Sequence, residues 1–254
     1  MASDIPSDLS TPPGDAGRRR GRRTIPILCA TALTCLAVAV AAGTAAHREL
    51  ARAPTAAQRA AAAAMAVTAR WHSWRAGLIF PPALSYSTSL LTTETATRVG
   101  IAPQSACASA IDPALRKLAV RDRCQAALRA TYVDELQGVL YTVGVLAFPT
   151  ARDASAFATG LSASTHTTIP LRALALPGTA SALFRAAAGQ SATARHDGSF
   201  VVLTVAGYAD GEPSGPGQEA RAAIFGPAAQ LAGEVIRPLT RSPTVNCASK
   251  AWSC

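Results

Sequence analysis

Residues 126–148 read AALRATYVDELQGVLYTVGVLAF and predict two neighbouring strands at the centre of an antiparallel sheet. In the first half, apolar residues alternate with Arg129 and Thr131, which is typical of a strand with one buried face. In the second half, residues 139–148 are apolar on both faces, which predicts a fully buried, central strand. The residues between the two halves have the length and composition of a hairpin loop.

A helix is predicted directly after the second strand. Thr150 is a favourable N-cap residue, and Asp153 follows at the third position, as in a capping box. Phe157 and Leu161 are four residues apart, so they lie on the same side of such a helix. This region therefore predicts a unit of strand, strand and helix.

A second, looser unit of the same kind follows. Residues 171–176 are expected to form a short strand that ends at Pro177-Gly178. The segments 192–195 and 199–208 flank His196-Asp197-Gly198, and Asp-Gly is a strong signal for a hairpin turn. A helix that extends to Pro238 completes the unit. The apolar stripe of this helix consists of Phe225, Ala228, Leu231 and Val235.

Together the two units predict an α+β domain over residues 78–239, with an antiparallel sheet and helices on one face. Placed side by side, the units would be similar to ferredoxin-like or small sensor-like folds. Residues 78–82 contain two prolines and are expected to form a short edge strand or an extended approach to the sheet.

A juxtamembrane helix rich in alanine is predicted over residues 48–77, immediately before the domain. Val67, Trp71 and Trp74 fall on one stripe of this helix. Two tryptophans near a membrane can form an interfacial belt. These two lie well beyond the membrane edge along the chain, so we expect them to pack on the domain instead.

Five arginines within residues 18–23 directly precede an apolar segment, residues 24–47, that contains no Asp, Glu, Lys or Arg. About 20 apolar residues in a helix span the hydrocarbon core of a bilayer. Arginines beside such a segment stay on the cytoplasmic side. The sequence therefore predicts a single-pass protein of the cell membrane, with a disordered cytoplasmic tail over residues 1–23 and an extracellular C-terminus.

Two interpretations of residues 24–47 compete, a retained signal anchor and a cleaved secretory signal peptide. A basic segment before the apolar run and the small residues Thr44-Ala45-Ala46 are typical of a cleavable signal, with a mature N-terminus at His47. The uncharged run is longer than the usual apolar region of a signal peptide. We therefore expect the anchor to be retained.

The net charge of +9 raises the question of a nucleic-acid partner. Residues 1–23 hold five Arg and three Asp, a net charge of +2, so the rest of the chain carries the remaining +7. In that part the arginines are spread singly, and the part is predicted to lie outside the cell. We expect no nucleic-acid partner and interpret the charge as a solvated surface that faces anionic lipid headgroups or wall polymers.

The six cysteines divide along the same boundary, because two of them lie in the apolar segment. Cys107, Cys124, Cys247 and Cys254 lie beyond it, in a compartment that permits disulfides. Four cysteines allow three pairings, and closeness in sequence favours Cys107–Cys124 and Cys247–Cys254. The second bond would belong to residues 240–254, an irregular tail without hydrophobic periodicity.

Sequence motifs for catalysis, metals or cofactors are absent, since the chain contains no HExxH, GxSxG, Walker A or GxGxxG pattern. We expect no cofactor and no metal. His196-Asp197 could join a nucleophile elsewhere in the fold, but a histidine and an aspartate at a hairpin turn are the simpler explanation. Asp134-Glu135 could be a pair of carboxylates, but adjacent residues in a turn point apart, so we interpret them as part of a solvated loop.

Tyr208 and Asp210 are the strongest candidates for a ligand-binding or partner-binding lip. They lie at the end of a predicted strand, and loops at strand ends often carry binding groups. A tyrosine ring that closes the core beside an Asp-Gly turn is the competing explanation.

Four blocks of sequence resemble blocks that recur in uncharacterised, membrane-anchored actinobacterial proteins. The resemblance covers residues 70–237 and implies an extracytoplasmic domain without assigning any catalytic residue. The blocks are Trp74-x-x-Gly77-x-Ile79-Phe80-Pro81, Arg98-Val99-Gly100-Ile101-Ala102-Pro103, Cys124-x-Ala126-x-Leu128-Arg129-Ala130-Thr131-Tyr132 and Ala206-Gly207-Tyr208-Ala209-Asp210-Gly211.

These features predict a non-enzymatic role. The chain is expected to present an extracytoplasmic interaction or accessory domain, to contact membrane lipid through its anchor and to bind an extracytoplasmic protein partner. The alternative is a secreted or membrane-tethered hydrolase whose site is assembled in space from residues far apart in the sequence.

Overall fold

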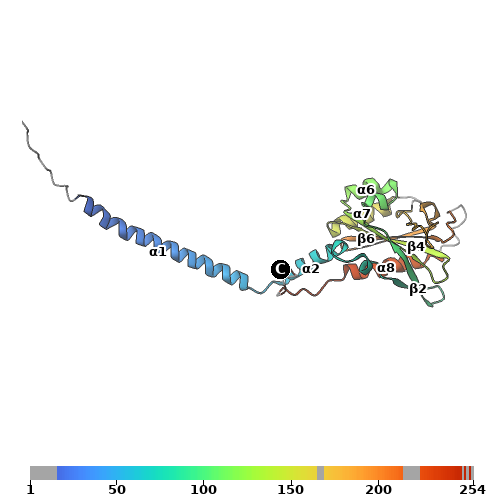
Figure 1. Cartoon of the computed structure of the whole chain (residues 1–254), viewed down its shortest axis with the longest axis horizontal. Helices are drawn as coiled ribbons and strands as arrows, with labels where there is room; N and C mark the ends of the chain where they lie inside the picture. Colours follow the sequence, from blue (N-terminus) through green and yellow to red (C-terminus); the bar gives the residue numbers. More distant parts are fainter. Residues whose placement is uncertain (1–15, 165–168, 214–223, 248, 250–251, 253–254) are drawn as a thin grey trace, which may run out of the picture. The chain divides into compact units, whose positions relative to one another are not determined.

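The protein consists of two compact units, Met1–Thr55 and Ala56–Cys254. The computed structural model describes residues 16–164, 169–213, 224–247, 249 and 252. Helix α1 (Ala16–Ala51) makes up the described part of the first unit (Figure 1). The arginine cluster was expected in a disordered tail over residues 1–23, but α1 begins at Ala16, so the cluster is helical. Residues 1–15 lie outside the described residues.

Helix α1 is long and apolar enough to cross a membrane, by length and composition. Its window Ala30–Glu49 has a mean hydropathy of 1.5, and none of it is buried by the rest of the protein. The hydroxyls of Thr34 and Thr44 donate to carbonyl oxygens one turn earlier in the helix, so neither polar group needs water. A membrane anchor and a signal sequence share these properties.

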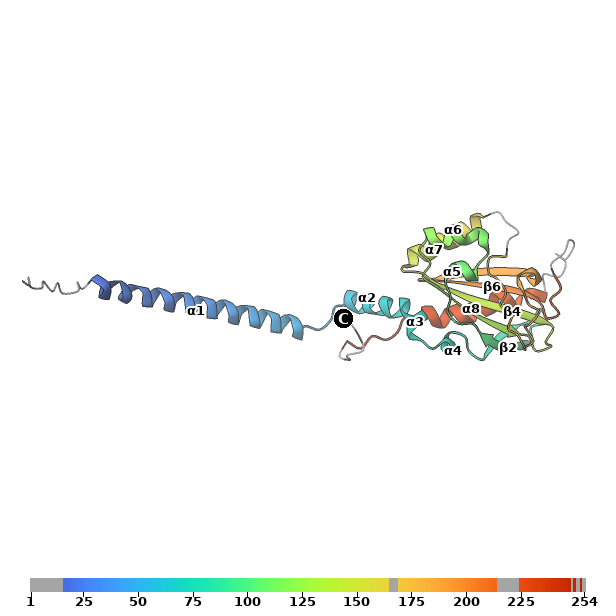
Figure 2. The ribbon, with the colours of Figure 1, turned by 45° about the horizontal axis from the view of Figure 1, so that its top comes forward.

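The second unit is an α+β domain built on one antiparallel sheet, which confirms the predicted class. Six strands follow the order β1-β2-β3-β4-β6-β5, and every neighbouring pair is antiparallel (Figures 1 and 2). The strands are β1 (Ala83–Ser87), β2 (Thr93–Ile101), β3 (Ala126–Val133), β4 (Val139–Ala147), β5 (Ser191–Asp197) and β6 (Phe200–Tyr208).

Helices precede, interrupt and follow these strands. The α-helices are α2 (Ala56–Thr68), α3 (Arg70–Ser73), α4 (Ala76–Ile79), α5 (Cys107–Ala110), α6 (Arg116–Arg121), α7 (Ala151–Ala163) and α8 (Pro227–Thr240). Two 3₁₀ turns, η1 (Pro113–Leu115) and η2 (Ala186–Ala188), complete the set of described elements.

Helices cover both faces of the sheet, so the predicted arrangement with helices on one face is wrong. Helix α8 packs on the face that carries Leu128 and Val202, whereas Phe157 of α7 packs on the opposite face. The reason lies in the central strands, because β3, β4 and β6 are buried on both sides. Thr131, expected on an exposed face, is fully buried.

Hydrogen bonds explain how this buried threonine is tolerated. The hydroxyls of Thr131 and Thr142 lie 3.0 Å apart on neighbouring strands, and that of Thr131 also donates to the carbonyl oxygen of Leu174 at 2.8 Å. Both hydroxyls thus have partners inside the core, and a buried polar group is costly only when it has none.

The two predicted hairpins and one predicted cap are confirmed. Strand β3 pairs with β4, and β5 pairs with β6 through a turn at Gly198, whose φ of +53° suits a residue without a side chain. Thr150 caps α7, since its hydroxyl accepts a hydrogen bond from the backbone N–H of Asp153 at 3.2 Å.

The predicted strand over residues 171–176 does not form. Only an isolated bridge joins Ile111 to Leu171, and the backbone N–H of Leu174 donates to the hydroxyl of Thr142. The side chain of Leu171 lies directly over Gly144 of β4, where an added Cβ would be 2.6 Å from it. This segment therefore crosses the face of the sheet instead of extending it.

The region before the sheet also differs from its prediction. Residues 78–82 contain the end of α4, and the edge strand β1 begins after them at Ala83. The single helix predicted over residues 48–77 does not form. Its first residues belong to α1, which ends at Ala51 in the first unit, and the rest is divided into α2, α3 and the start of α4 in the second unit. Trp71 and Trp74 pack against the core under α8, as expected.

Candidate functional site

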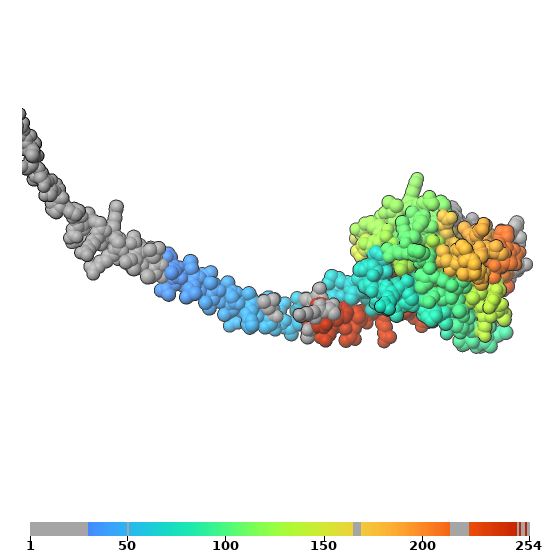
Figure 3. All heavy atoms as spheres, in the orientation of Figure 1, coloured from blue at the N-terminus to red at the C-terminus, as the bar shows by residue number. Residues whose placement is uncertain are grey.

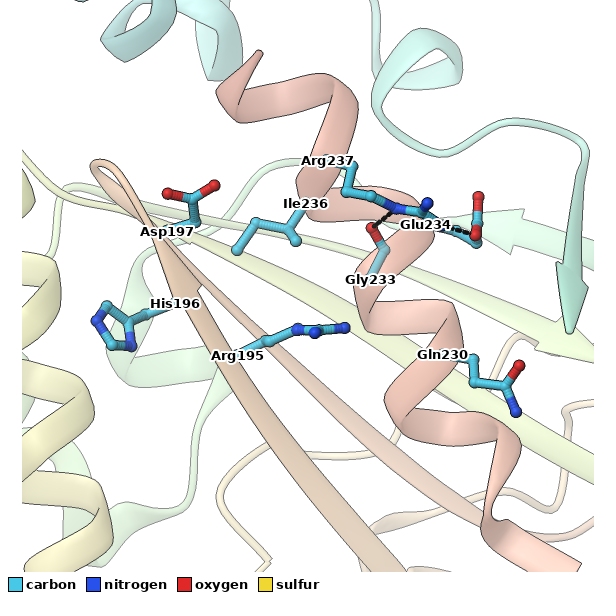
Figure 4. A pocket seen from close by; sticks show the side chains of 8 residues that line it. All are labelled: Arg195, His196, Asp197, Gln230, Gly233, Glu234, Ile236 and Arg237. Carbon is cyan, nitrogen blue, oxygen red and sulfur yellow. Dashed lines mark hydrogen bonds and ion pairs between the residues drawn. The ribbon is translucent and has the colours of Figure 1, made fainter.

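His196 and Asp197 do not form a catalytic pair. Asp197 is the register partner of Phe200, and His196 is the partner of Val201, and these two partners belong to cores on opposite faces of the sheet. Figure 4 shows the imidazole directed away from the carboxylate. The carboxylate accepts a hydrogen bond from the hydroxyl of Thr240 at 2.6 Å. Asp197 therefore holds the hairpin to α8, and His196 lies on the other face of the sheet.

A surface hollow of about 540 Å³ lies between β5 and α8. Arg195 reaches across it towards Gly233, where an added Cβ would be 2.6 Å from the guanidinium nitrogen (Figure 4). Glu234 and Arg237 form an ion pair on its other side. Among the described residues that line it there is no Ser, Thr or Cys side chain that could act as a nucleophile. The hollow is an exposed depression of mixed charge.

A smaller pocket of about 180 Å³ lies near the N-terminal end of α8. We call it the tyrosine pocket, because two tyrosines from separate strands form part of its wall. Strand β1, the start of β2, the β3–β4 turn and the start of β4 all contribute to it. Its lining residues are Tyr86, Thr88, Ser89, Glu94, Asp134, Val139, Tyr141, Ile224 and Pro227.

Two carboxylates in the tyrosine pocket are held by hydrogen bonds. The hydroxyl of Tyr86 donates to one oxygen of Glu94 at 2.7 Å. The backbone N–H of Val139 donates to one oxygen of Asp134 at 2.8 Å, which closes the β3–β4 turn. In both cases only one carboxylate oxygen is used by these bonds.

Tyr141 differs from Tyr86 because its hydroxyl has no hydrogen-bond partner among the described residues. Its side chain is only 1% exposed, and its ring centroid lies 6.4 Å from that of Tyr86. The hydroxyl oxygen is not among the fully buried polar atoms that lack a partner, so this atom is open to the pocket although the residue as a whole is buried. The polar group of Tyr141 is therefore available to whatever occupies the pocket.

Electrostatics keep both phenols neutral. Burial raises the pKa of Tyr86 well above its ordinary value, and the hydrogen bond to Glu94 adds to the effect. Burial also raises the pKa of Tyr141, with further contributions from the charges of Asp134 and Glu94. Since no Lys, Arg or His is among its described lining residues, the pocket combines two carboxylates with two uncharged phenols.

The predicted lip lies at the same end of the sheet as the tyrosine pocket. Tyr208 is the register partner of Val139, and its ring packs against Phe225 with a centroid distance of 5.3 Å. A carboxylate oxygen of Asp210 accepts a hydrogen bond from the backbone N–H of Glu212 at 2.9 Å. The assignment of these two residues as a partner-binding lip stays a prediction.

Exposed large apolar side chains lie in the two turns that contribute residues to the pocket. Leu90 and Leu91 in the β1–β2 turn are 84% and 90% exposed, and Leu136 in the β3–β4 turn is 85% exposed. Ile224, which lines the pocket, is also exposed. We call these four residues the apolar rim. The two turns lie together at the end of the sheet remote from α2 (Figures 2 and 3).

The disulfide predicted between Cys107 and Cys124 is confirmed, with the two Cα atoms 6.2 Å apart. It joins the start of α5 to the residues just before β3, on the face of the sheet opposite α8. Cys247 is also disulfide-bonded. Its predicted partner, Cys254, lies outside the described residues, so that pairing stays a prediction.

Comparison with protein-family models, curated proteins and solved structures finds no match. The similarity to ferredoxin-like or sensor-like folds and to actinobacterial anchored proteins therefore stays a prediction. Within the part of the chain that the structure describes, no three His, Cys, Asp or Glu side chains gather as metal ligands would. What the structure defines is an α+β domain that follows one candidate membrane-spanning helix.

Proposed function

We propose that the protein is a single-pass membrane protein whose second unit is an extracytoplasmic interaction module. The observation that carries the proposal is the apolar window Ala30–Glu49, which the rest of the protein leaves wholly uncovered. An apolar helix of this length is stable in a bilayer, because all its backbone groups are paired within the helix. The arginines within residues 18–23 favour a cytoplasmic N-terminus.

The apolar rim supports binding to a protein partner. Soluble surfaces carry single exposed apolar residues without a function, but a group of them bordered by polar residues marks interaction sites. Leu91 adds a second argument, because its φ of +61° places a leucine in a backbone region that large residues rarely adopt. Such backbone strain is concentrated at functional positions. We propose that the apolar rim is the contact surface of the module.

The order of elements repeats in two units, β3-β4-α7 and β5-β6-α8, but the positions of the helices do not follow a ferredoxin-like or sensor-like arrangement. A rotation that places the first strand pair on the second would put both helices on the same face of the sheet. Helices α7 and α8 lie on opposite faces, so the two units are similar in order and are not rotated copies of each other.

The hydrolase alternative has less support. It requires a nucleophile and a base within hydrogen-bonding distance, and His196 and Asp197 point to opposite faces of the sheet. The tyrosine pocket holds two carboxylates, but about 180 Å³ is well below the roughly 300–1,000 Å³ of ordinary ligand pockets. It can accept the end of a molecule and not both sides of a scissile bond.

Site-specific photocrosslinking in native membranes tests the proposal. A crosslinker replaces Leu136 in the apolar rim, and a matched variant carries it at Val120 of α6, which is 74% exposed and lies outside the rim. We expect one discrete protein adduct from position 136 and none of that size from position 120. Equal labelling from both positions, or only uncrosslinked monomer from both, would contradict the proposal.

A further inference from the structure

We propose that the tyrosine pocket binds the ammonium group of a lysine side chain presented by the protein partner. The inference rests on the proposed function, because the apolar rim is the surface that brings such a side chain to the pocket. It adds the chemical class of the ligand and the residues that select it, namely Glu94, Asp134 and Tyr141.

The charge of the pocket selects a cation. Glu94 and Asp134 each use one carboxylate oxygen in the hydrogen bonds described above, and their second oxygens can accept from a ligand. Pro227 begins α8 at the pocket wall, and a helix N-terminus contributes roughly half a positive charge. That is too little to neutralise two carboxylates, and the described lining supplies no Lys, Arg or His.

Tyr141 supplies an observation independent of the acidic residues. Its side chain is 1% exposed, lines the pocket, and has a hydroxyl without a hydrogen-bond partner among the described residues. A neutral phenol oxygen accepts hydrogen bonds from N–H groups, and an ammonium group has three to donate. Two carboxylates and one phenol oxygen therefore match the donors of a primary ammonium in number.

The volume of the pocket indicates a side chain and not a whole molecule. About 180 Å³ is the space of roughly six water molecules, since each takes about 30 Å³ in the liquid. An ammonium group with a short methylene stem fits such a space. The leucines of the apolar rim belong to the same two turns that line the pocket, and apolar contact with them suits a protein surface better than a hydroxyl-rich sugar polymer.

A metal ion fits the pocket less well than an organic cation. Calcium takes about six to eight oxygen ligands, and the pocket offers two carboxylates plus neutral hydroxyls. No cluster of three acidic, histidine or cysteine side chains exists among the residues that the structure describes. We therefore expect that calcium does not compete with an ammonium ligand for the pocket.

The test measures ligand binding to the full-length protein in detergent by ligand-observed NMR. The probe is n-butylammonium, which is the lysine side chain without its backbone, and 1-butanol is the neutral control of similar size. We expect saturable binding of butylammonium and none of 1-butanol. Equal binding of the two compounds, or displacement of butylammonium by equimolar calcium, would overturn the assignment.

Three variants locate the site. Glu94→Gln removes one charge, and Tyr141→Phe removes only the unpaired hydroxyl, so the second variant keeps the core volume. Each should weaken butylammonium binding, Glu94→Gln by about tenfold, because the half-buried carboxylate no longer pairs with the ammonium charge. Glu135→Gln, an exposed neighbour of Asp134 that does not line the pocket, should leave binding unchanged. An unchanged affinity in both pocket variants would refute the site.

Binding of a peptide tests whether the ligand is a lysine side chain of a protein or a free amine. The capped tripeptide Leu-Lys-Leu should bind more tightly than butylammonium because its leucines reach the apolar rim, and acetylation of its lysine should abolish binding. Weaker binding of the tripeptide than of butylammonium would contradict the claim that the ammonium group belongs to a protein partner.

The two proposals can fail separately. A specific crosslink at position 136 with no butylammonium binding would end the lysine assignment and leave the interaction module in place. Butylammonium binding that depends on Glu94, without a specific crosslink at position 136, would keep the ammonium pocket and end the interaction module.

Discussion

Removal of the Cys107–Cys124 disulfide should lower the stability of the second unit by an amount that the structure sets. The bond closes a loop with a sequence separation of 17 residues. In the chain-entropy model a loop of this size restricts the unfolded chain by about 3 kcal/mol at 25 °C. Folded domains have a total stability of only about 5–15 kcal/mol, so the loss is a large fraction.

The expected change in melting temperature follows from the size of the unit. The entropy of unfolding is about 2.1 cal/mol/K per residue, or about 0.4 kcal/mol/K for roughly 200 residues. A loss of about 3 kcal/mol therefore lowers the midpoint by about 7 °C. Because Cys107 is buried, the double variant Cys107→Ala/Cys124→Ala also leaves a small cavity, which adds to the shift.

Thermal unfolding of the full-length protein, followed by circular dichroism, measures the effect. The matched control is Cys247→Ala/Cys254→Ala, which breaks the predicted tail disulfide and should shift the midpoint by less, because its loop is shorter. Non-reducing peptide mapping should recover Cys107 joined to Cys124. Equal shifts in the two double variants, or a Cys107–Cys247 peptide, would refute the reasoning.

Three further predictions concern packing, a helix end and acid stability. Gly207→Ala should destabilise the second unit several times more than Gly138→Ala does. An added Cβ at position 207 would lie 2.1 Å from a backbone oxygen, whereas one at position 138 meets nothing within 4 Å. Similar midpoints of urea unfolding in the two variants would contradict the packing around Gly207. Arg70→Met should lower the free energy of unfolding by about 3 kcal/mol, because the buried guanidinium donates to two carbonyl oxygens at the end of α8, at 2.9 and 2.8 Å. An unchanged midpoint of urea unfolding would argue against that contact. The hydrogen bond from Arg123 lowers the pKa of Asp153, so this carboxylate stabilises the fold above its unfolded pKa and loses that effect as pH falls. Asp153→Asn should therefore flatten the fall in melting temperature on acidification, and an unchanged pH profile would contradict this role.

The centre of the fold could be predicted because its signals are local. The β3–β4 hairpin, the Thr150 cap and the stripe of α8 are each encoded within about a dozen residues. Strand β2 is hard to predict because most of its residues are half-buried, which leaves little periodicity in the sequence. Strand β1 does alternate, with Leu84 and Tyr86 buried between exposed neighbours, but over only five residues. The segment from Leu171 to Leu176 does not form the predicted strand because Leu171 covers Gly144 and Leu176 covers Gly100, long-range contacts that no local pattern reports.

The tyrosine pocket could not be predicted for the same physical reason. Tyr86, Glu94 and Asp134 come from three segments that only the sheet brings together, and Tyr141 is identical in pattern to an ordinary core residue. The sequence places Asp134 in a turn, and the structure confirms this, but its place in the wall of the pocket depends on strands β1 and β2, which the sequence does not predict. The predicted lip at Tyr208 stays a prediction, and the structure puts this residue at the same end of the sheet as the pocket, as the register partner of Val139.

The central claim is that a retained apolar helix tethers an outward-facing module, and protease treatment of intact spheroplasts tests it most directly. Mass spectrometry of the washed membranes should recover a short protected fragment that contains residues 18–23 and the window Ala30–Glu49, with the second unit digested away. A second unit that stays protected until the membrane is lysed would contradict the orientation. A mature protein that begins at His47 and is released from the membrane would contradict the tether.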